Sequence, residues 1–437
     1  MNRPSFPPFS DRGLWVGRFR WLICGLLFTA TAINYVDRQI IGLLKPTLQL
    51  EYGWTESSFG DVIFWFQAAY ALGYLASGRL IDAIGARLGY AAVVAFWTLA
   101  HVAHALVGSL GGFIAVRFAL GLGESGNFPA GLKAVAEWFP QRERAFATGI
   151  FTAGSNIGAI VTPLIVPFIT LHWGWRGAFV ITGAFSVVWL AAWLKIYRPP
   201  QEHPRVTPAE LALITENGDV RPPLPGAALG WRQLLQVRET WAYTIARFLI
   251  DPIWWMFLFW LPDFFSKRYG LDLAHFGPPL VVVYLISDVG SVAGGWMSSR
   301  MLKSGVSLNK SRKLTLLIAS LMVMPVMFAM YADHLWLAVA IVGLATAGHQ
   351  AFSVNLYTFP SDVFPRQAVA TVVGIGGTAG AVGGMLMSKY AGWVLDSVGS
   401  YTPIFIVAGT AYLLALLMFH ALSPHLAAVS FRLAPRH

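Results

Sequence analysis

The chain has 437 residues, of which 56% are hydrophobic and only 12% are charged, and its mean hydropathy is +0.59. These values lie outside the range of an ordinary soluble domain and indicate a protein embedded in lipid. The net charge of +10 does not indicate nucleic-acid binding, because the basic residues fall in alternate breaks between apolar segments rather than in one patch. The single cysteine, Cys24, excludes structural disulfides within the chain.

Six apolar segments fill the first part of the chain, and each is long enough to cross a bilayer, which takes roughly 20 residues. The first begins after basic residues, as a signal peptide would, but Asn34, Asp37 and Arg38 interrupt it and no small-residue cleavage site follows. We therefore expect a retained helix. The predicted spans are 20–44, 58–80, 88–108, 111–136, 143–170 and 176–197.

Ionisable residues inside spans are functional candidates, because a charge at the bilayer centre costs no less than roughly 2.5 kcal/mol. In the first span Asp37 and Arg38 are adjacent and point to different neighbours, since a helix turns about 100° per residue. In the fourth span Arg117 and Glu124 share one face about 10 Å apart, so we expect each to meet a partner on another helix. The alternative is a static ion-pair network that only orients helices.

Polar residues in the second, third and fifth spans are weaker candidates. Gln67 and Tyr70 share one helix face and offer hydrogen bonds to a polyol, although aromatic helix packing explains them as well. Asn156 lies among glycines and either reaches a cavity or makes a helix–helix hydrogen bond. We interpret His101 and His104 as packing residues rather than metal ligands, because no carboxylate or cysteine accompanies them in the sequence.

After residue 197 the composition changes to a proline-rich, charged stretch that cannot span lipid. We interpret this stretch as a cytoplasmic linker between two six-helix bundles, which gives the boundaries 1–197, 198–239 and 240–437. The spans predicted for the second half are 240–266, 277–300, 313–331, 335–359, 367–391 and 401–423.

The second half also carries buried ionisable residues. Arg247 and Asp251 are four residues apart, so Arg247 either faces a substrate or is neutralised by Asp251. His349 is either a proton relay or a hydrogen-bonded packing residue. Asp288 lies in the eighth span, and the sequence identifies no partner for it. The other substrate-binding candidates of this half are Trp254, Gln350 and Asn355.

Short repeats indicate that the two halves are duplicated. The pattern Gly-x-x-x-Asp-x-x-Gly occurs over 78–85 and again over 392–399. The first copy resembles the signature of the major facilitator superfamily between its second and third helices. It reads Gly78-Arg79-Leu80-Ile81-Asp82-Ala83-Ile84-Gly85-Ala86-Arg87.

This resemblance implies an all-α membrane protein with twelve transmembrane helices in two pseudo-symmetric six-helix bundles. It also implies a conformational lock on the cytoplasmic side, in which Gly78 and Gly85 allow close helix approach and Asp82 pairs with Arg87. In the second half Ser299 stands where the signature has an acid, so a matching lock is not expected there.

A closer resemblance is to the anion:cation symporter family within that superfamily. It is carried by Tyr35, Arg38, Tyr70, Arg117 and Glu124, with Gly121-x-Gly123-Glu124 and Asn127-x-Pro129-Ala130-Gly131. Further motifs resemble bacterial hexuronate transporters over nearly the whole chain: Ala130-Gly131-Leu132-Lys133, Glu137-Trp138-Phe139-Pro140, Arg247-Phe248-Leu249-x-Asp251-Pro252-x-Trp254, Gly348-His349-Gln350-Ala351 and Ser361-Asp362-Val363-Phe364. The resemblance implies proton symport of glucuronate or galacturonate. Asp37 beside the arginine is a feature of galactonate-type carriers, which leaves the proton stoichiometry open.

Together these observations predict a secondary active transporter that takes up a sugar acid with protons. Arginine suits the substrate carboxylate because its planar fork binds bidentately, and Arg38 is the first candidate. Asp37 and Glu124, with Arg117, are the candidates for proton coupling, because a carboxylate that gains and loses an arginine partner changes its proton affinity. The alternative is a carrier of another organic anion (galactonate or another aldonate, glucarate, a dicarboxylate or an aromatic acid) or of phosphate.

The basic residues lie in alternate segments between the predicted spans, and by the positive-inside rule this places both termini in the cytoplasm, which fits a bacterial inner membrane. We expect a monomer whose partners are the lipid bilayer, a small organic anion and H⁺, without nucleic acid. The sequence has no P-loop, so the proton gradient, rather than a cofactor or ATP, is the expected driving force. No metal site, catalytic nucleophile or soluble signalling domain is evident, which disfavours an enzyme or a sensor.

Overall fold

The computed structural model describes residues 19–215 and 231–429, and every longer element in these ranges is a helix. The helices of the first half are α1 (Phe19–Tyr52), α2 (Glu56–Ala103), α3 (Leu110–Glu124), α4 (Asn127–Trp138) and α5 (Gln141–Ile196). Two short helices follow, α6 (Pro208–Thr215) and α7 (Trp231–Leu235). Those of the second half are α8 (Arg238–Tyr269), α9 (Gly277–Lys303), α10 (Leu308–Val323), α11 (Leu335–Val363), α12 (Arg366–Ser397) and α13 (Thr402–Leu422).

Two of these helices, α2 and α5, each contain two membrane passes. The 56 residues of α5 would extend about 84 Å as a straight helix, against a hydrocarbon core of about 30 Å. Each helix instead reverses at a glycine with positive φ, Gly85 in α2 (81°) and Gly174 in α5 (71°). Glycine adopts this conformation without the strain that a Cβ would introduce. Both reversals fall in the breaks between predicted spans.

The fourth pass is broken, where the sequence predicts one continuous helix over 111–136. Helix α3 ends at Glu124, and α4 begins at Asn127 after the turn formed by Ser125 and Gly126. The hydroxyl of Ser125 donates to the carbonyl of Leu122 at 2.7 Å, which satisfies one of the carbonyls at the end of α3. The break therefore lies directly beside a buried carboxylate.

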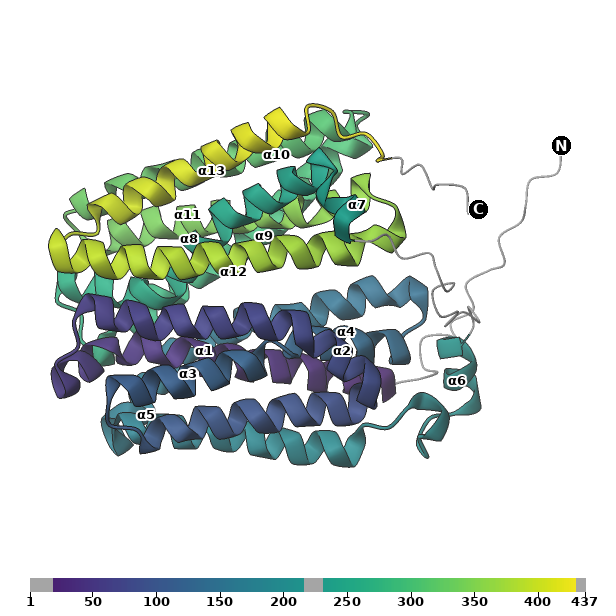
Figure 1. The fold of residues 1–437 in the computed structure, drawn as a ribbon, viewed down its shortest axis with the longest axis horizontal. Coiled ribbons are helices and arrows are strands. Elements are labelled where there is room, and N and C mark those ends of the chain that lie inside the picture. The colour runs from purple at the N-terminus through teal and green to yellow at the C-terminus, as the bar shows by residue number, and fades with distance from the viewer. Residues whose placement is uncertain (1–18, 216–230, 430–437) are drawn as a thin grey trace.

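The two halves form two bundles that lie side by side (Figure 1). Helices α1 to α5 make up one bundle and α8 to α13 the other, and the two termini of the described helices, the start of α1 and the end of α13, lie at the same end of the molecule. Most contacts between the bundles are made by α2 with α12, α5 with α9, and α1 with α8. Residues on these six helices can therefore be shared between the halves.

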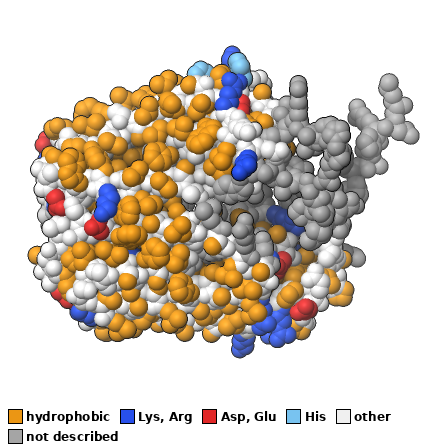
Figure 2. Space-filling view, in the orientation of Figure 1, with side chains coloured by type: hydrophobic (Ala, Val, Ile, Leu, Met, Phe, Trp, Pro, Cys, Tyr) orange, Lys and Arg blue, Asp and Glu red, His pale blue; other side chains and the backbone are white. Residues whose placement is uncertain are grey.

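The outer surface of the bundles is apolar (Figure 2). Large side chains such as Leu99, Val188 and Leu417 are more than half exposed, and hydrophobic side chains cover much of the face shown. By length and composition, nine helical segments of the described chain qualify as membrane spans, one of which is the long α5 region. An apolar exterior around buried charges is the arrangement expected of a multi-pass membrane protein.

Candidate functional site

Arg38 lies at the interface between the bundles and is only 2% exposed. Its Nε donates to Glu124 Oε2 at 2.8 Å, and its Nη2 donates to Asn34 Oδ1 at 3.0 Å. Aromatic rings surround the guanidinium with centroids 4.7–5.9 Å from its carbon, and one of them comes from the other bundle; the rings are those of Tyr35, Tyr70, Trp255 and Phe66. Arg38 is thus a buried cation with one ion-pair partner, one amide partner and four cation–π contacts.

Glu124 and Arg117 each meet a partner on α1, as their seven-residue spacing on one face predicts. Glu124 bonds to the Arg38 side chain, whereas Arg117 Nη2 donates to the backbone carbonyl of Arg38 at 3.1 Å. The guanidinium of Arg117 also lies over Phe66, with its carbon 4.6 Å from the ring centroid. One Glu124 oxygen and two Arg117 nitrogens have no hydrogen-bond partner among the described residues.

Asp37 faces away from this arginine, into the interior of the first bundle. Its Oδ1 is 3.3 Å from Nε2 of His101, and its Oδ2 accepts a hydrogen bond from Ser186 at 3.2 Å. The sequence shows no carboxylate beside His101, but the structure brings one to it from 64 residues away, because α1 and α2 both pack against α5. No group of three or more His, Cys, Asp or Glu in the described ranges could hold a metal ion.

Gln67 lies on α2 opposite α12, close to the aromatic rings around Arg38. Its two amide atoms are buried and have no partner within the described parts of the chain. A Cβ at Gly384 on α12 would collide with this amide, so the glycine is what allows the helix to approach. Tyr70 stacks on Tyr74 with centroids 6.0 Å apart. Gln67 therefore offers a donor and an acceptor between the bundles.

The second bundle holds a separate ion pair. Arg247 Nη2 lies 2.6 Å from Asp251 Oδ2 on the same helix, and Nη1 donates to the hydroxyl of Tyr243 at 3.1 Å. The ring centroid of Tyr357 on α11 is 4.4 Å from the guanidinium carbon. Of the two alternatives that the sequence left open, the structure thus has Arg247 paired with Asp251.

His349 is held by other side chains of the second bundle. Its Nδ1 is 2.5 Å from the hydroxyl of Tyr412, and its Nε2 is 3.3 Å from the hydroxyl of Ser353. The indole of Trp254 stacks on the imidazole with centroids 5.1 Å apart and planes 10° apart. Gln350 follows on the same helix and is half-buried. The structure thus brings Trp254 and His349 together.

Asn355 does not join these groups. Its amide nitrogen donates to the carbonyl of Gly294 on α9, and its amide oxygen accepts from Arg312, which also pairs with Asp362. These contacts are those of a residue that joins helices of one bundle.

Asn156 occupies a different place, where the two bundles meet. It lies on α5 and interacts with the carboxyl of Asp288 on α9. Asn156 is therefore a neighbour of Asp288 from the other bundle, which the sequence does not identify.

The signature between α2's two passes is described only in part. Gly85 forms the reversal, and a Cβ added at Gly78 would meet no described atom within 4 Å. Arg87 Nη2 donates to the carbonyl of Leu194 at 2.7 Å. The side chain of Asp82 lies outside the described residues.

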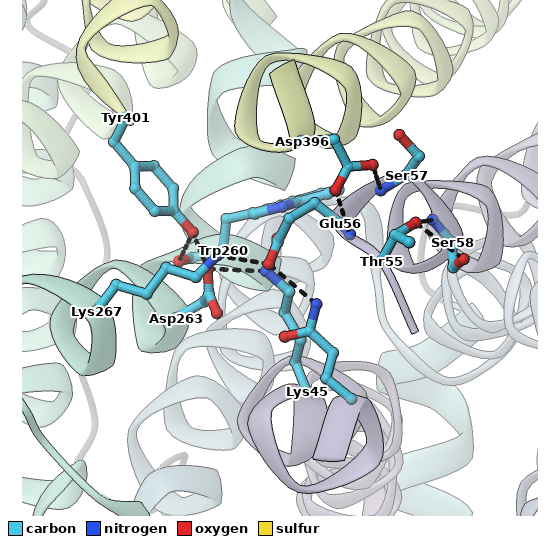
Figure 3. Close-up of polar contacts among 11 residues, drawn as sticks. Lys45, Thr55, Glu56, Ser57, Ser58, Trp260, Asp263, Lys267, Asp396 and Tyr401 are labelled. Carbon is cyan, nitrogen blue, oxygen red and sulfur yellow. Dashed lines mark hydrogen bonds and ion pairs between the residues drawn. The ribbon is translucent and has the colours of Figure 1, made fainter. Parts of the chain in front are cut away.

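A cluster of opposite charges joins the bundles where α1 ends and α2 begins, which is the end of the molecule opposite the start of α1. Figure 3 shows its contacts. Buried Lys45 on α1 lies 2.8 Å from Asp263 on α8, and Lys267 on α8 lies 2.5 Å from Glu56 on α2. Asp396 on α12 accepts hydrogen bonds from the first two backbone N–H groups of α2, those of Glu56 at 2.9 Å and Ser57 at 2.8 Å. Sequence reasoning missed this cluster because its members lie at predicted span ends, where charges are ordinary.

Other groups at the interface were also missed. Trp255 contributes the ring from the second bundle to Arg38, and Gln39 donates to the hydroxyl of Tyr284 on α9 at 2.7 Å. The Trp254–Trp255 pair and the amide directly after Arg38 were visible in the sequence. Which neighbour each would meet was not.

Comparison with known proteins agrees with the fold of this chain. Residues 27–388 match the Major Facilitator Superfamily model. The chain is 33% identical to the hexuronate transporter of Escherichia coli K12 over 402 residues, covering 91% of this chain and 93% of that protein. It is also 33% identical to the galacturonate transporter of Dickeya chrysanthemi over 317 residues, covering 72% of this chain and 90% of the relative.

The fold is also found in a solved structure. A bacterial homologue of the human lysosomal transporter Spinster, in an inward-facing and occupied conformation, superposes with a TM-score of 0.72 at 16% identity, covering 93% of this chain and 97% of that one. The predicted fold and family are confirmed. The chain belongs to the major facilitator superfamily and is a membrane transporter with two pseudo-symmetric six-helix bundles.

Proposed function

We propose that this transporter takes up a hexuronate, such as glucuronate or galacturonate, together with protons across a bacterial inner membrane. The relatives that are 33% identical carry hexuronates and galacturonate by name. The observation that carries the proposal is the buried Arg38–Glu124 pair at the bundle interface. A substrate carboxylate competes with Glu124 for the same guanidinium, so binding of the anion and protonation of Glu124 are linked.

The charges around Arg38 support one proton for each monoanion. Arg38 and Arg117 are balanced by Glu124 and Asp37, and all four side chains are buried. A monoanion would leave an uncompensated negative charge in a low-dielectric site, which is strongly unfavourable unless one proton enters with it. The ring of Trp255, whose centroid is 5.2 Å from the guanidinium carbon of Arg38, and the buried, unpartnered amide of Gln67 support the proposal that these two side chains contact the remainder of a sugar acid.

A dianionic substrate is less well supported. It would use a second cation in the other bundle, and the candidate, Arg247, is already paired with Asp251 at 2.6 Å. A dicarboxylate would have to displace two acidic partners, Glu124 and Asp251, and would need two charges compensated rather than one. A monocarboxylate sugar acid therefore fits the charges better.

Alternating access follows from where the bundles are joined. In the described part of the chain, the ion pairs between bundles lie at the end opposite the termini. With the termini in the cytoplasm, which the positive-inside rule favours, this end is periplasmic. We propose that the monomer rocks about the central site and opens this end to load substrate. The proton gradient drives the cycle, without a further cofactor.

Uptake in proteoliposomes tests the proposal. With an inside-alkaline pH gradient, the wild-type protein should accumulate labelled glucuronate or galacturonate. Arg38→Ala should abolish uptake, and Arg38→Lys should restore little because it loses the bidentate fork. Glu124→Gln should retain exchange of internal for external substrate but lose accumulation. Gradient-driven accumulation by Glu124→Gln equal to that of the wild type would refute the assignment of the proton to this residue.

A further inference from the structure

One face of α9 is hollowed along the last part of the helix. Two open hollows follow one another there and share Trp296. The first, of about 540 Å³, is lined by residues between 296 and 304, and the second, of about 510 Å³, by residues between 288 and 296. The apolar side chains of Val289, Val292 and Trp296 are more than half exposed in them. The two hollows therefore form one groove along the helix, which we name the α9 groove.

The α9 groove is basic at one end. Arg300 and Lys303 line this end and are exposed, and neither has a hydrogen-bond or ion-pair partner among the described residues. The guanidinium carbon of Arg300 lies 5.5 Å from the ring centroid of Trp296, a cation–π contact that holds the charge against the groove. Asp362 on α11 pairs instead with Arg312 at 2.9 Å. The two cations are therefore available to an anion from outside the chain.

Ser299 contributes to this basic end by not being an acid. It stands where the repeated signature has an acid, and its side chain lines the groove beside Arg300. A carboxylate at this position would neutralise the arginine and repel an anion, whereas a hydroxyl donates a hydrogen bond to one. The hydroxyl of Ser304, which also lines the groove, already donates to the carbonyl of Met301 at 2.9 Å. The departure from the signature thus leaves two cations and one hydroxyl donor together.

The position of the α9 groove matches one leaflet of the bilayer. Helix α9 begins after Lys267, at the end of the molecule that holds the charge cluster, so it finishes at the end where α1 starts. The positive-inside rule places this end in the cytoplasm. From Val289 to Lys303 the helix rises about 21 Å, and one leaflet with its headgroups is about 20 Å thick. The basic end therefore lies at the depth of the headgroups and the apolar end points toward the middle of the membrane.

We propose that the α9 groove binds one anionic phospholipid of the cytoplasmic leaflet. The lipid phosphate contacts Arg300, Lys303 and Ser299, and one acyl chain lies over the apolar residues of the groove. Two cations favour a lipid with a net negative charge over one whose phosphate is balanced by its own amine. Asp288 lines the far end, about 18 Å from Arg300 along the helix axis. It interacts there with Asn156 on α5, so the carboxylate lies beside the acyl chain and not beside the phosphate.

Quenching by brominated lipids tests the proposal. Bimane is attached to Val289→Cys in a protein that carries Cys24→Ala, and the protein is reconstituted in phosphatidylcholine vesicles. Brominated phosphatidylglycerol should quench this label at an about 30-fold lower mole fraction than brominated phosphatidylcholine, since each basic residue near the membrane surface contributes about fivefold. Arg300→Gln and Lys303→Gln should each lower the preference about fivefold. Ser299→Asp, which restores the acid of the signature, should lower it as well.

Two controls separate the groove from general surface charge and from soluble anions. Lys310 on α10 is exposed at the same end of the molecule, has no ion-pair partner in the described part of the chain and does not line the groove. Lys310→Gln should therefore leave the preference for phosphatidylglycerol unchanged. Millimolar inorganic phosphate at constant ionic strength should not reduce the quenching, because it supplies no acyl chain for the apolar end.

Each contrary result overturns the proposal. Equal quenching by the two brominated lipids in the parent protein would show that the groove does not select an anionic lipid. The same preference in the parent and in Arg300→Gln, Lys303→Gln and Ser299→Asp would show that the basic end does not bind the lipid. An equal loss in Lys310→Gln would attribute the preference to surface charge, and displacement by inorganic phosphate would attribute the basic end to a soluble phosphate. None of these measurements depends on the transported solute or on protons, so the proposed function is tested separately.

Discussion

Replacing Lys45 with methionine is expected to open the end of the molecule opposite the termini. Lys45 is fully buried and is paired with both Glu56 at 2.5 Å and Asp263 at 2.8 Å. Removing one partner of a buried pair typically costs 3–5 kcal/mol, because it leaves the other charge uncompensated. Here Lys267, which is 43% exposed, still reaches both carboxylates, so the net loss should be roughly half of this value.

A loss of about 2 kcal/mol from the closed form corresponds to a change of about 30-fold in the equilibrium between closed and open forms. Spin labels at Leu50 on α1 and at Val398 directly after α12 report on this change, because they are 88% and 57% exposed and lie on opposite bundles. Cys24 is the only cysteine and would be replaced by alanine. Double electron–electron resonance should show a longer-distance population in Lys45→Met that is minor in the parent protein.

The matched control is Arg176→Gln. Arg176 pairs with Glu51 at the same end of the molecule, but both residues belong to the first bundle and both are well exposed. An exposed pair within one bundle contributes little and does not differ between closed and open forms, so the distances should be unchanged. Populations in Lys45→Met within about twofold of the parent would refute the reasoning that this cluster holds the bundles together.

Two further changes test helix contacts of α12. Asp396→Asn removes the negative charge of the carboxylate that accepts hydrogen bonds from the first backbone N–H groups of α2, including that of Glu56. The population with the longer label distance should rise about fivefold. Unchanged distances would contradict this expectation. Gly380→Ala places a methyl group against the Asp251 carboxylate and should destabilise the protein by about 2 kcal/mol, lowering the apparent Tm in detergent, whereas Gly377→Ala meets open space and should not. Equal Tm values for the two alanine variants would show that the collision is relieved without cost.

Local sequence features determined the helical architecture. In lipid, a run of about 20 apolar residues must form a helix, because its backbone N–H and C=O groups have to hydrogen-bond within the segment itself. Gly85 and Gly174 fall in the polar breaks where the chain has to reverse, and their positive φ is open to glycine without strain. The break after Glu124 was not predicted, because Ser125 and Gly126 also occur within continuous membrane helices.

The candidate site could be predicted because charged residues inside apolar spans are costly to bury and are visible in the sequence alone. Arg38, Arg117 and Glu124 stand out because few residues of these types lie inside apolar spans. Spacing also determined that Arg117 and Glu124 share a face. The sequence did not determine that Glu124 would meet Arg38, 86 residues away, rather than Asp37 next to it.

Only the tertiary structure decided the partners. The pairing of Asp37 with His101, of Arg247 with Asp251 rather than with an open site, and of Asn355 with Arg312 all depend on how each helix is rotated and tilted against its neighbours. Helical periodicity fixes which residues share a face, but it does not fix which other face they meet, and a few tens of degrees of rotation would change every partner. The same holds for the charges between the bundles, where Lys45 and Asp263 lie more than 200 residues apart and meet only because α1 packs against α8.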